Sequence, residues 1–203
     1  MEPAAEAAGY SERGCRVPCA ETYHLTWTCY GQWLHGDERG YVDRKHRTPG
    51  EPYPEGNLQY YNAASNRMTE AACWLTDDER RIASRALREA CDFRGWVLWA
   101  VNVQPDHAHV LVEARETSGK RARQVLKDRA TRGLEAEGRR RQHWWTEGGK
   151  VDVIRRERQL QEVLDYINER QPFARIDERE CPAASAAGSD KEEHLHPKEG
   201  EAQ

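Results

Sequence analysis

Two histidines, His107 and His109, are separated by one residue in the apolar stretch Pro105–Glu113, which predicts a strand. Side chains on a strand alternate between its two faces, so both imidazoles lie on one face, together with Leu111. Two imidazoles on one face can chelate a metal ion. Histidine pairs with this spacing also occur at strand ends that bind nothing, so the surrounding elements must decide between these readings.

The elements before the histidines begin with a strand at Thr22–Tyr30, where aromatic and β-branched residues are frequent and alternate. The stretch 31–68 contains Gly, Pro, Asp and Asn throughout, which predicts a long irregular loop. Thr76 and Glu79 then form a capping box that begins a helix, and Gly95 ends this helix.

The segment Trp96–Val103 is apolar on both faces, which indicates a central strand buried between other layers. Only three residues separate it from the histidine strand, too few for a crossover, so the two strands form an antiparallel hairpin. A second helix is expected over Lys120–Glu137 and a short strand over Val151–Ile154. The last helix is expected over Glu157–Gln171, with an apolar stripe centred near Leu160.

The resulting order is β-α-β-β-α-β followed by a helix, which predicts an α+β fold of the ferredoxin-like (RRM-like) class. Such a fold has an antiparallel sheet with helices on one face, and the histidines lie on a central strand of it. We expect residues 1–20 to be a flexible leader, 21–176 to form one domain and 177–203 to be a disordered tail.

The composition suits a soluble protein, because 37% of the 203 residues are hydrophobic, 33% are charged and the formal net charge is −4. No apolar run approaches the roughly 18 residues of a membrane span, and the N-terminus lacks the order of a signal peptide. We therefore expect a cytoplasmic protein with no membrane partner. The cysteines show no C-x-x-C spacing, so Cys29, Cys73 and Cys91 are expected to be reduced, buried thiols.

Basic residues are concentrated between Arg115 and Arg141, a stretch that contains ten Lys or Arg and only four Asp or Glu. This local excess is typical of a nucleic-acid-binding face, although a solvated helix face has the same pattern. The neighbouring Trp144 and Trp145 either pack in the core or form a surface on which bases stack. Tyr166 projects about 110° from the centre of the last helix's apolar stripe, at the border of its buried face.

Together and in this order, these elements resemble the IS200-like transposases and the related REP-associated tyrosine transposases, single-stranded-DNA enzymes of the HUH class. The resemblance runs from Tyr23 to about Gln171. Its parts are Tyr23-His24-Leu25-Thr26 on the first strand, Pro-Asp-His-Ala-His-Val-Leu-Val at 105–112, the basic helix, the turn Trp145-Thr146-Glu147-Gly148-Gly149, and Tyr166-Ile167 on the last helix.

The resemblance implies that His107 and His109 are ligands of Mg²⁺ or Mn²⁺, an ion that would polarise the scissile phosphate. It also implies that Tyr166 is the nucleophile, which leaves a 5′-phosphotyrosine link and a free 3′-OH. The implied function is a metal-dependent transposase and endonuclease that cleaves and rejoins single-stranded DNA near hairpins.

The third ligand departs from the family pattern, which places a Gln or Asn about one turn after the tyrosine. Position 170 is Arg, which cannot coordinate a cation. Asn168, Glu169 and Gln171 are the candidates. On a helical wheel Gln171 falls about 20° from Leu160, toward the sheet, so we prefer Gln171 over the alternative that it is an ordinary residue at the helix end.

The resemblance further implies that the basic helix and the two tryptophans bind the substrate, single-stranded DNA with hairpins at repeat or element ends. The residues expected to contact this DNA are Lys120, Arg121, Arg123, Lys127, Trp144 and Trp145. Because members of the family form dimers as well as monomers, the resemblance is compatible with a homodimer and with a monomer.

Two other functions remain as alternatives at this point. The first is a domesticated protein that binds DNA hairpins without cutting them, although such a protein has no need of His107, His109 and Tyr166 together. The second is zinc-dependent hydrolysis by the same histidine pair, for which the sequence offers no evident general base.

Overall fold

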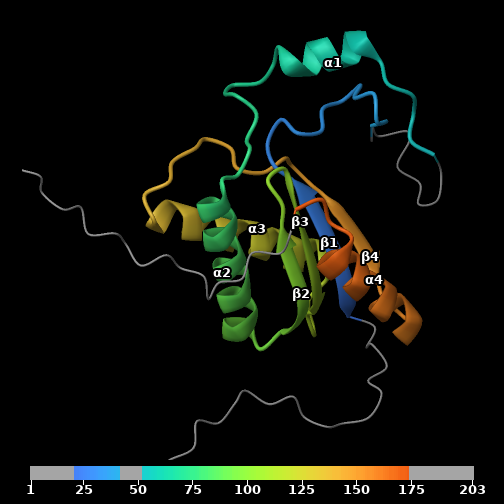
Figure 1. Cartoon of the computed structure of the whole chain (residues 1–203), viewed down its shortest axis with the longest axis vertical. Helices are drawn as coiled ribbons and strands as arrows, with labels where there is room; N and C mark the ends of the chain where they lie inside the picture. The colour runs from blue at the N-terminus through green and yellow to red at the C-terminus, as the bar shows by residue number, and fades with distance from the viewer. Residues whose placement is uncertain (1–20, 42–51, 174–203) are drawn as a thin grey trace, which may run out of the picture.

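The computed structural model describes residues 21–41 and 52–173, so the predicted leader, the predicted tail and Cys15, Cys19 and Cys181 lie outside the described residues. The elements in chain order are β1 (Thr22–Thr28), α1 (Leu58–Ser65), α2 (Asp77–Arg94), β2 (Val97–Val103), β3 (His107–Glu113), α3 (Gly119–Ala136), β4 (Lys150–Val153) and α4 (Glu157–Glu169). Figure 1 shows these elements around one sheet, with α1 set apart from the others above one end of it.

The sheet has the strand order β2-β3-β1-β4, and all its neighbouring strands are antiparallel. This arrangement confirms the predicted ferredoxin-like class, the hairpin of β2 and β3, and the central position of the histidine strand. The prediction of helices on one face holds only for α2 and α3, because α4 packs on the opposite face. The prediction that β2 is central was wrong, because β2 is an edge strand. It is apolar on both faces because α2 contacts one of its faces and α4 contacts the other.

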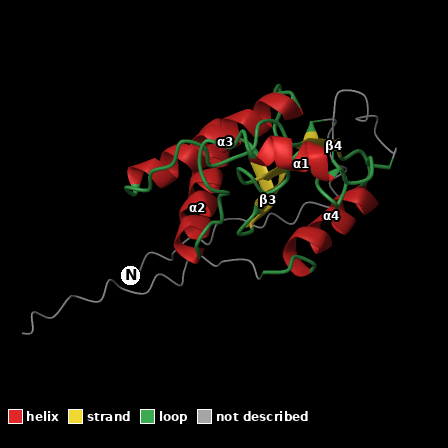
Figure 2. Ribbon diagram, turned by 90° about the horizontal axis from the view of Figure 1, so that it is seen from above, coloured by secondary structure: helices red, strands yellow, loops and turns green. Residues whose placement is uncertain are grey.

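The two faces of the sheet carry separate cores, and Figure 2 shows α2 and α3 on one side of the strands and α4 on the other. Ala108, Val110 and Val112 of β3 pack in the larger core, under α2 and α3. Leu111 packs in the smaller core with Leu160 and Ile167 of α4. Since strand side chains alternate, His107 and His109 lie on the α4 face with Leu111.

Both ends of α2 agree with the sequence analysis, whereas α4 ends at Glu169 and not at the expected Gln171. Thr76 Oγ1 accepts from the backbone N–H of Glu79, whose side chain accepts from the Thr76 backbone, and Gly95 ends α2 in the left-handed conformation at φ 65°. Ser118 caps α3 by accepting from the Arg121 backbone N–H. These caps fix where α2 and α3 begin, and thus how they sit on the sheet.

The prediction that stretch 31–68 lacks regular structure was wrong, because α1 lies within it. None of the residues of α1 is buried, so this helix has no core-facing stripe that a sequence could reveal. The Asn57 side chain caps it by accepting from Tyr60 N–H. Cys29, Cys73 and Cys91 are free and buried, as predicted. In the described ranges, no helix has both the length and the apolar character needed to cross a membrane.

Candidate metal and nucleophile site

The pairing of β1 with β3 brings further polar side chains beside the histidines. Thr26 is paired with His109 and Thr28 with His107 across the two strands. His24 lies two residues from Thr26 on the same face of β1, and its ring stacks on that of His109 at 5.3 Å between centroids. Because β1 and β3 are the central strands, these side chains are held on a rigid surface.

The imidazole of His107 is oriented by the residue before it. His107 Nδ1 lies 2.6 Å from Asp106 Oδ1, so the ring donates its Nδ1 hydrogen to the carboxylate. This hydrogen bond lowers the pKa of Asp106 below its ordinary value and keeps the carboxylate charged. In the tautomer that carries its hydrogen on Nδ1, the lone pair of Nε2 lies on the other side of the ring, where it can bind a metal ion.

The imidazole of His109 is only 4% exposed, and burial lowers its pKa to about 3, so the ring is neutral at pH 7. His107 and His24 lower this pKa further, as nearby basic groups do. His109 Nδ1 lies 3.1 Å from both His24 Nε2 and Thr26 Oγ1. Among the described residues, His109 Nε2 has no hydrogen-bond partner although it is buried.

Gln171 completes the group of atoms that can hold a metal. Its Oε1 lies 3.2 Å from His107 Nε2, while its Nε2 donates to Tyr166 O at 3.2 Å. An amide oxygen facing an imidazole lone pair is unfavourable unless a proton or a cation lies between them. Across residues 21–41 and 52–173 no group of three or more His, Cys, Asp or Glu could hold a metal. An amide oxygen such as Gln171 Oε1 is a suitable further ligand beside two imidazoles.

The donor set therefore fits a divalent ion. His107 Nε2, the unpartnered His109 Nε2 and Gln171 Oε1 would hold it, with two nitrogens and one oxygen and with coordination positions left for water or phosphate. The rings of His107 and His109 are nearly perpendicular, with centroids 4.7 Å apart. This geometry supports Gln171 as the ligand in place of the residue at position 170, which is the C-cap of α4.

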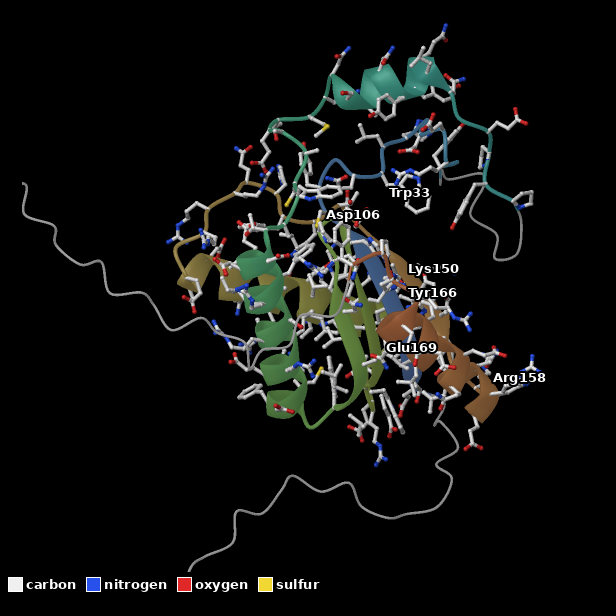
Figure 3. All side chains as sticks on the ribbon, in the orientation of Figure 1. Trp33, Asp106, Lys150, Arg158, Tyr166 and Glu169 are labelled. Atoms are coloured by element: carbon white, nitrogen blue, oxygen red, sulfur yellow. The ribbon has the colours of Figure 1, made fainter. Side chains whose placement is uncertain are left out.

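Tyr166 lies on α4 beside this group. Its ring centroid is 5.3 Å from that of His109 and 6.3 Å from that of His24, in edge-to-face geometry. The side chain is 40% exposed, so a substrate can reach it from solvent. Figure 3 shows Tyr166 on α4 and Asp106 higher up, at the end of the sheet that lies toward α1.

The basic residues predicted to bind DNA divide into two groups. Lys120 and Arg121 are exposed at the start of α3. Lys127 is 6% exposed, and its Nζ donates to Thr146 O at 2.5 Å and to Gly148 O at 3.1 Å. Burial, followed by nearby Arg123, lowers the pKa of Lys127 to about 8. The expectation of an outward-facing Lys127 was wrong, because its ammonium holds the loop before β4.

Arg123 and the two tryptophans are also parts of the fold. Arg123 is partly buried and donates to Gly149 O. Trp144 is 4% exposed within the larger core, so it has no free face on which a base could stack, contrary to the expectation for this residue. Trp145 is partly buried, packs edge to face on Trp27 and donates from Nε1 to Thr131 Oγ1 at 3.1 Å.

Sequence reasoning assigned no role to several residues that the structure brings to the site. These residues are His24 and Thr26, which belong to the motif on the first strand, and Asp106, which directly precedes His107. One signal was present for each: His24 and Thr26 alternate on one strand face, and a carboxylate precedes His107 directly. The strand register needed to place His24 and Thr26 opposite His109 was not available from the pattern.

Comparisons with known proteins give the family. A model of the family described as "Transposase IS200 like" matches residues 67–170, about half of the chain and all of the predicted site except the final ligand. The solved structure of a REP-associated tyrosine transposase bound to a REP hairpin is 14% identical and has a TM-score of 0.41, with coverage of 78% of this chain and 70% of that one. A Deinococcus radiodurans R1 protein, described as a predicted transposase, is 18% identical with a TM-score of 0.39, with coverage of 78% and 95%. No curated protein matches the chain. On the extent of the family match, the chain belongs to the IS200-like transposase family.

Proposed function

We propose that this protein is a divalent-metal-dependent enzyme that cleaves and rejoins single-stranded DNA near hairpins. The observation that carries the proposal is the contact of His107 Nε2 with Gln171 Oε1, next to the ring of His109, whose Nε2 has no partner among the described residues, and beside Tyr166. Mg²⁺ or Mn²⁺ held by these atoms would neutralise the charge that builds on the oxygens of the scissile phosphate.

The chain's own residues supply the nucleophile and its orientation. The Tyr166 oxygen attacks phosphorus in line, a phenolic O–P bond forms, and the bond from phosphorus to the 3′ oxygen breaks. The phenol releases its proton to solvent, and the departing 3′ oxygen takes one up to become a free 3′-OH. The 5′ end stays on Tyr166, so the reverse attack by a 3′-OH rejoins DNA without ATP.

The proposed substrate is single-stranded DNA with hairpins at repeat or element ends. The REP-associated tyrosine transposase named above was solved bound to a REP hairpin, which is consistent with this class of substrate. Lys120 and Arg121 are the proposed phosphate contacts, because both lie exposed on α3. Trp145 is only partly buried and remains a proposed contact for an unpaired base. The enzyme would act in the cytoplasm on nucleoid DNA, as a monomer or a homodimer.

Incubation of the protein with single-stranded hairpin DNA from the flanks of its own gene, in Mg²⁺ or Mn²⁺, tests the proposal. We expect a protein band shifted by covalently attached DNA on a denaturing gel. Tyr166→Phe retains the ring and its packing but lacks the hydroxyl, so this variant should bind the hairpin and form no adduct. Tight hairpin binding by the wild type without any adduct would favour the non-cleaving binder instead.

A further inference from the structure

Two buried amide side chains stand out in and just after β2. Asn102 is 1% exposed and Gln104 is 0% exposed. A buried amide loses its hydrogen bonds to water, so its burial is tolerated where protein atoms replace them. Their partners therefore indicate why an apolar strand ends in two amides.

These partners lie at both ends of the segment Ile167–Phe173. Asn102 Nδ2 donates to Ile167 O at 2.9 Å, and Asn102 Oδ1 accepts from Gln104 Nε2 at 2.8 Å. Gln104 Nε2 also donates to Phe173 O at 2.8 Å, and Gln104 Oε1 accepts from Phe173 N–H at 3.0 Å. We refer to Asn102 and Gln104 as the amide clamp.

The same two residues are bound to the histidine strand through their backbones. Asn102 is the partner of His109 in the register of β2 and β3. The backbone N–H of Gln104 donates to His107 O at 2.8 Å. Each clamp residue thus connects one candidate metal ligand on β3 with one end of the segment after Tyr166.

Apolar packing alone does not set this connection. Leu160 and Ile167 bury α4 on the sheet, but burial of apolar surface has no preferred direction and tolerates small shifts of the helix. Hydrogen bonds weaken steeply with distance and angle, so a connected and fully paired set of them selects one position. Tyr166 directly precedes Ile167, and Gln171 lies two residues before Phe173.

We propose that the amide clamp positions Tyr166 and Gln171 relative to His107 and His109 for the proposed reaction, on which this inference rests. Asn102 and Gln104 are positioning residues that touch neither DNA nor metal. Their loss should therefore reduce the rate of adduct formation and leave hairpin binding unchanged.

The variants Gln104→Met and Asn102→Leu test this, because each retains the volume of the side chain and removes its hydrogen bonds. In single-turnover reactions with hairpin DNA and Mn²⁺, we expect the adduct to form roughly 100-fold more slowly, as for a misplacement of about 1 Å. Mn²⁺ should bind the free protein about 10-fold more weakly, since Gln171 is displaced. The double variant should lose little beyond the larger single loss, because the two amides form one connected set.

Leu87→Ala is the matched control for stability. Leu87 is fully buried in the larger core, on the other face of the sheet, so its truncation destabilises the protein without touching α4. At a temperature where all variants are folded, Leu87→Ala should form the adduct at the wild-type rate. If Gln104→Met does not fold, Gln104→Glu replaces it, because it retains an acceptor for Phe173 N–H while it loses both donated bonds.

The outcomes separate the inference from the proposed function. Wild-type rates in the folded clamp variants, or an equal loss in Leu87→Ala, overturn the positioning role while the enzyme proposal stands. A wild-type protein that never forms the adduct overturns the enzyme proposal and the clamp's role together. A parallel loss of hairpin affinity in the clamp variants would make these residues part of DNA binding, which also overturns the inference.

Discussion

In the absence of metal, acid should destabilise this protein through His109. Burial lowers the pKa of His109 to about 3 in the folded chain, from an ordinary value of 6.5. As the pH falls through 6.5, the imidazole takes up a proton in the unfolded chain but not in the folded one. The unfolded state therefore gains stability first, and the free energy of unfolding decreases until the pH approaches 3.

The size of this effect follows from the two pKa values. One pKa unit corresponds to about 1.4 kcal/mol, so the complete loss between pH 6.5 and pH 3 is about 5 kcal/mol. Between pH 7 and pH 5 the loss is about 2 kcal/mol. This is a large part of the free energy of unfolding of a typical domain, which is about 5–15 kcal/mol. His24 lies beside His109, and burial lowers its pKa too, so it adds a loss of the same sign.

Urea unfolding at pH 7, 6 and 5 in the presence of EDTA measures the effect. His109→Phe fills similar space and cannot take up a proton, so its free energy of unfolding should fall by about 2 kcal/mol less than that of the wild type over this range. His143→Phe is the matched control, because His143 is an exposed histidine that stacks on Tyr30 at 4.9 Å. This control should retain the wild-type dependence on pH.

Parallel pH dependence of the wild type and His109→Phe would refute the reasoning, since it would mean that the buried imidazole contributes nothing to acid sensitivity. If His143→Phe reduced the pH dependence of the free energy of unfolding, the effect would be assigned to a surface histidine. Mn²⁺ provides a further check, because an ion bound by the neutral imidazole must be released when the ring is protonated. Its affinity for the wild type should therefore fall as the pH is lowered.

Three further predictions concern single contacts. His24→Phe retains the ring but removes an acceptor for His109 Nδ1, so Mn²⁺ should bind about 10–100-fold more weakly in calorimetry; unchanged affinity would leave Thr26 as the only orienting partner. Replacement of Lys120 and Arg121 by Gln should weaken hairpin binding for many sequences alike and reduce the slope of log affinity against log salt concentration by about 2. A changed sequence preference at constant affinity would contradict phosphate contacts. Lys127→Met should lower the free energy of unfolding by about 2 kcal/mol or more, because two loop carbonyls lose a charged donor; unaltered stability would show that this loop does not depend on Lys127.

The periodicity of apolar residues was sufficient for most of the fold. Period-two alternation on β3 placed His107 and His109 opposite the larger core, and the capping box with Gly95 located the ends of α2. It failed for β2, since burial on both faces indicates two covering layers and says nothing about neighbours within the sheet. A strand can lie at the edge of a sheet and still be covered by helices on both sides.

Charge counts were a weaker guide than periodicity. The excess of Lys and Arg along α3 predicted one DNA-binding face, but Lys127 and Arg123 donate to carbonyls of the loop 146–149. The reason is geometric: a long basic side chain reaches the backbone carbonyls of an adjacent loop as easily as it reaches solvent. A count of charges cannot separate these uses, because it contains no information on which carbonyls the loop presents.

Prediction of the metal site requires both the helical periodicity and the hydrogen-bond partners of the residues that follow the helix. The helical wheel favoured Gln171, since a rotation of about 20° from Leu160 would direct it toward the sheet. Because α4 ends at Glu169, the position of Gln171 follows from the chain after the helix and not from the wheel. The wheel could not say at what height along the histidine strand the Gln171 oxygen would lie. That height depends on Ile167 and Phe173, whose backbones are hydrogen-bonded to Asn102 and Gln104, amides that a periodicity analysis reads as interruptions of an apolar strand. A core tolerates a polar residue in an apolar strand only when a specific partner satisfies its hydrogen bonds. The partners of such residues therefore indicate how a neighbouring functional helix is positioned.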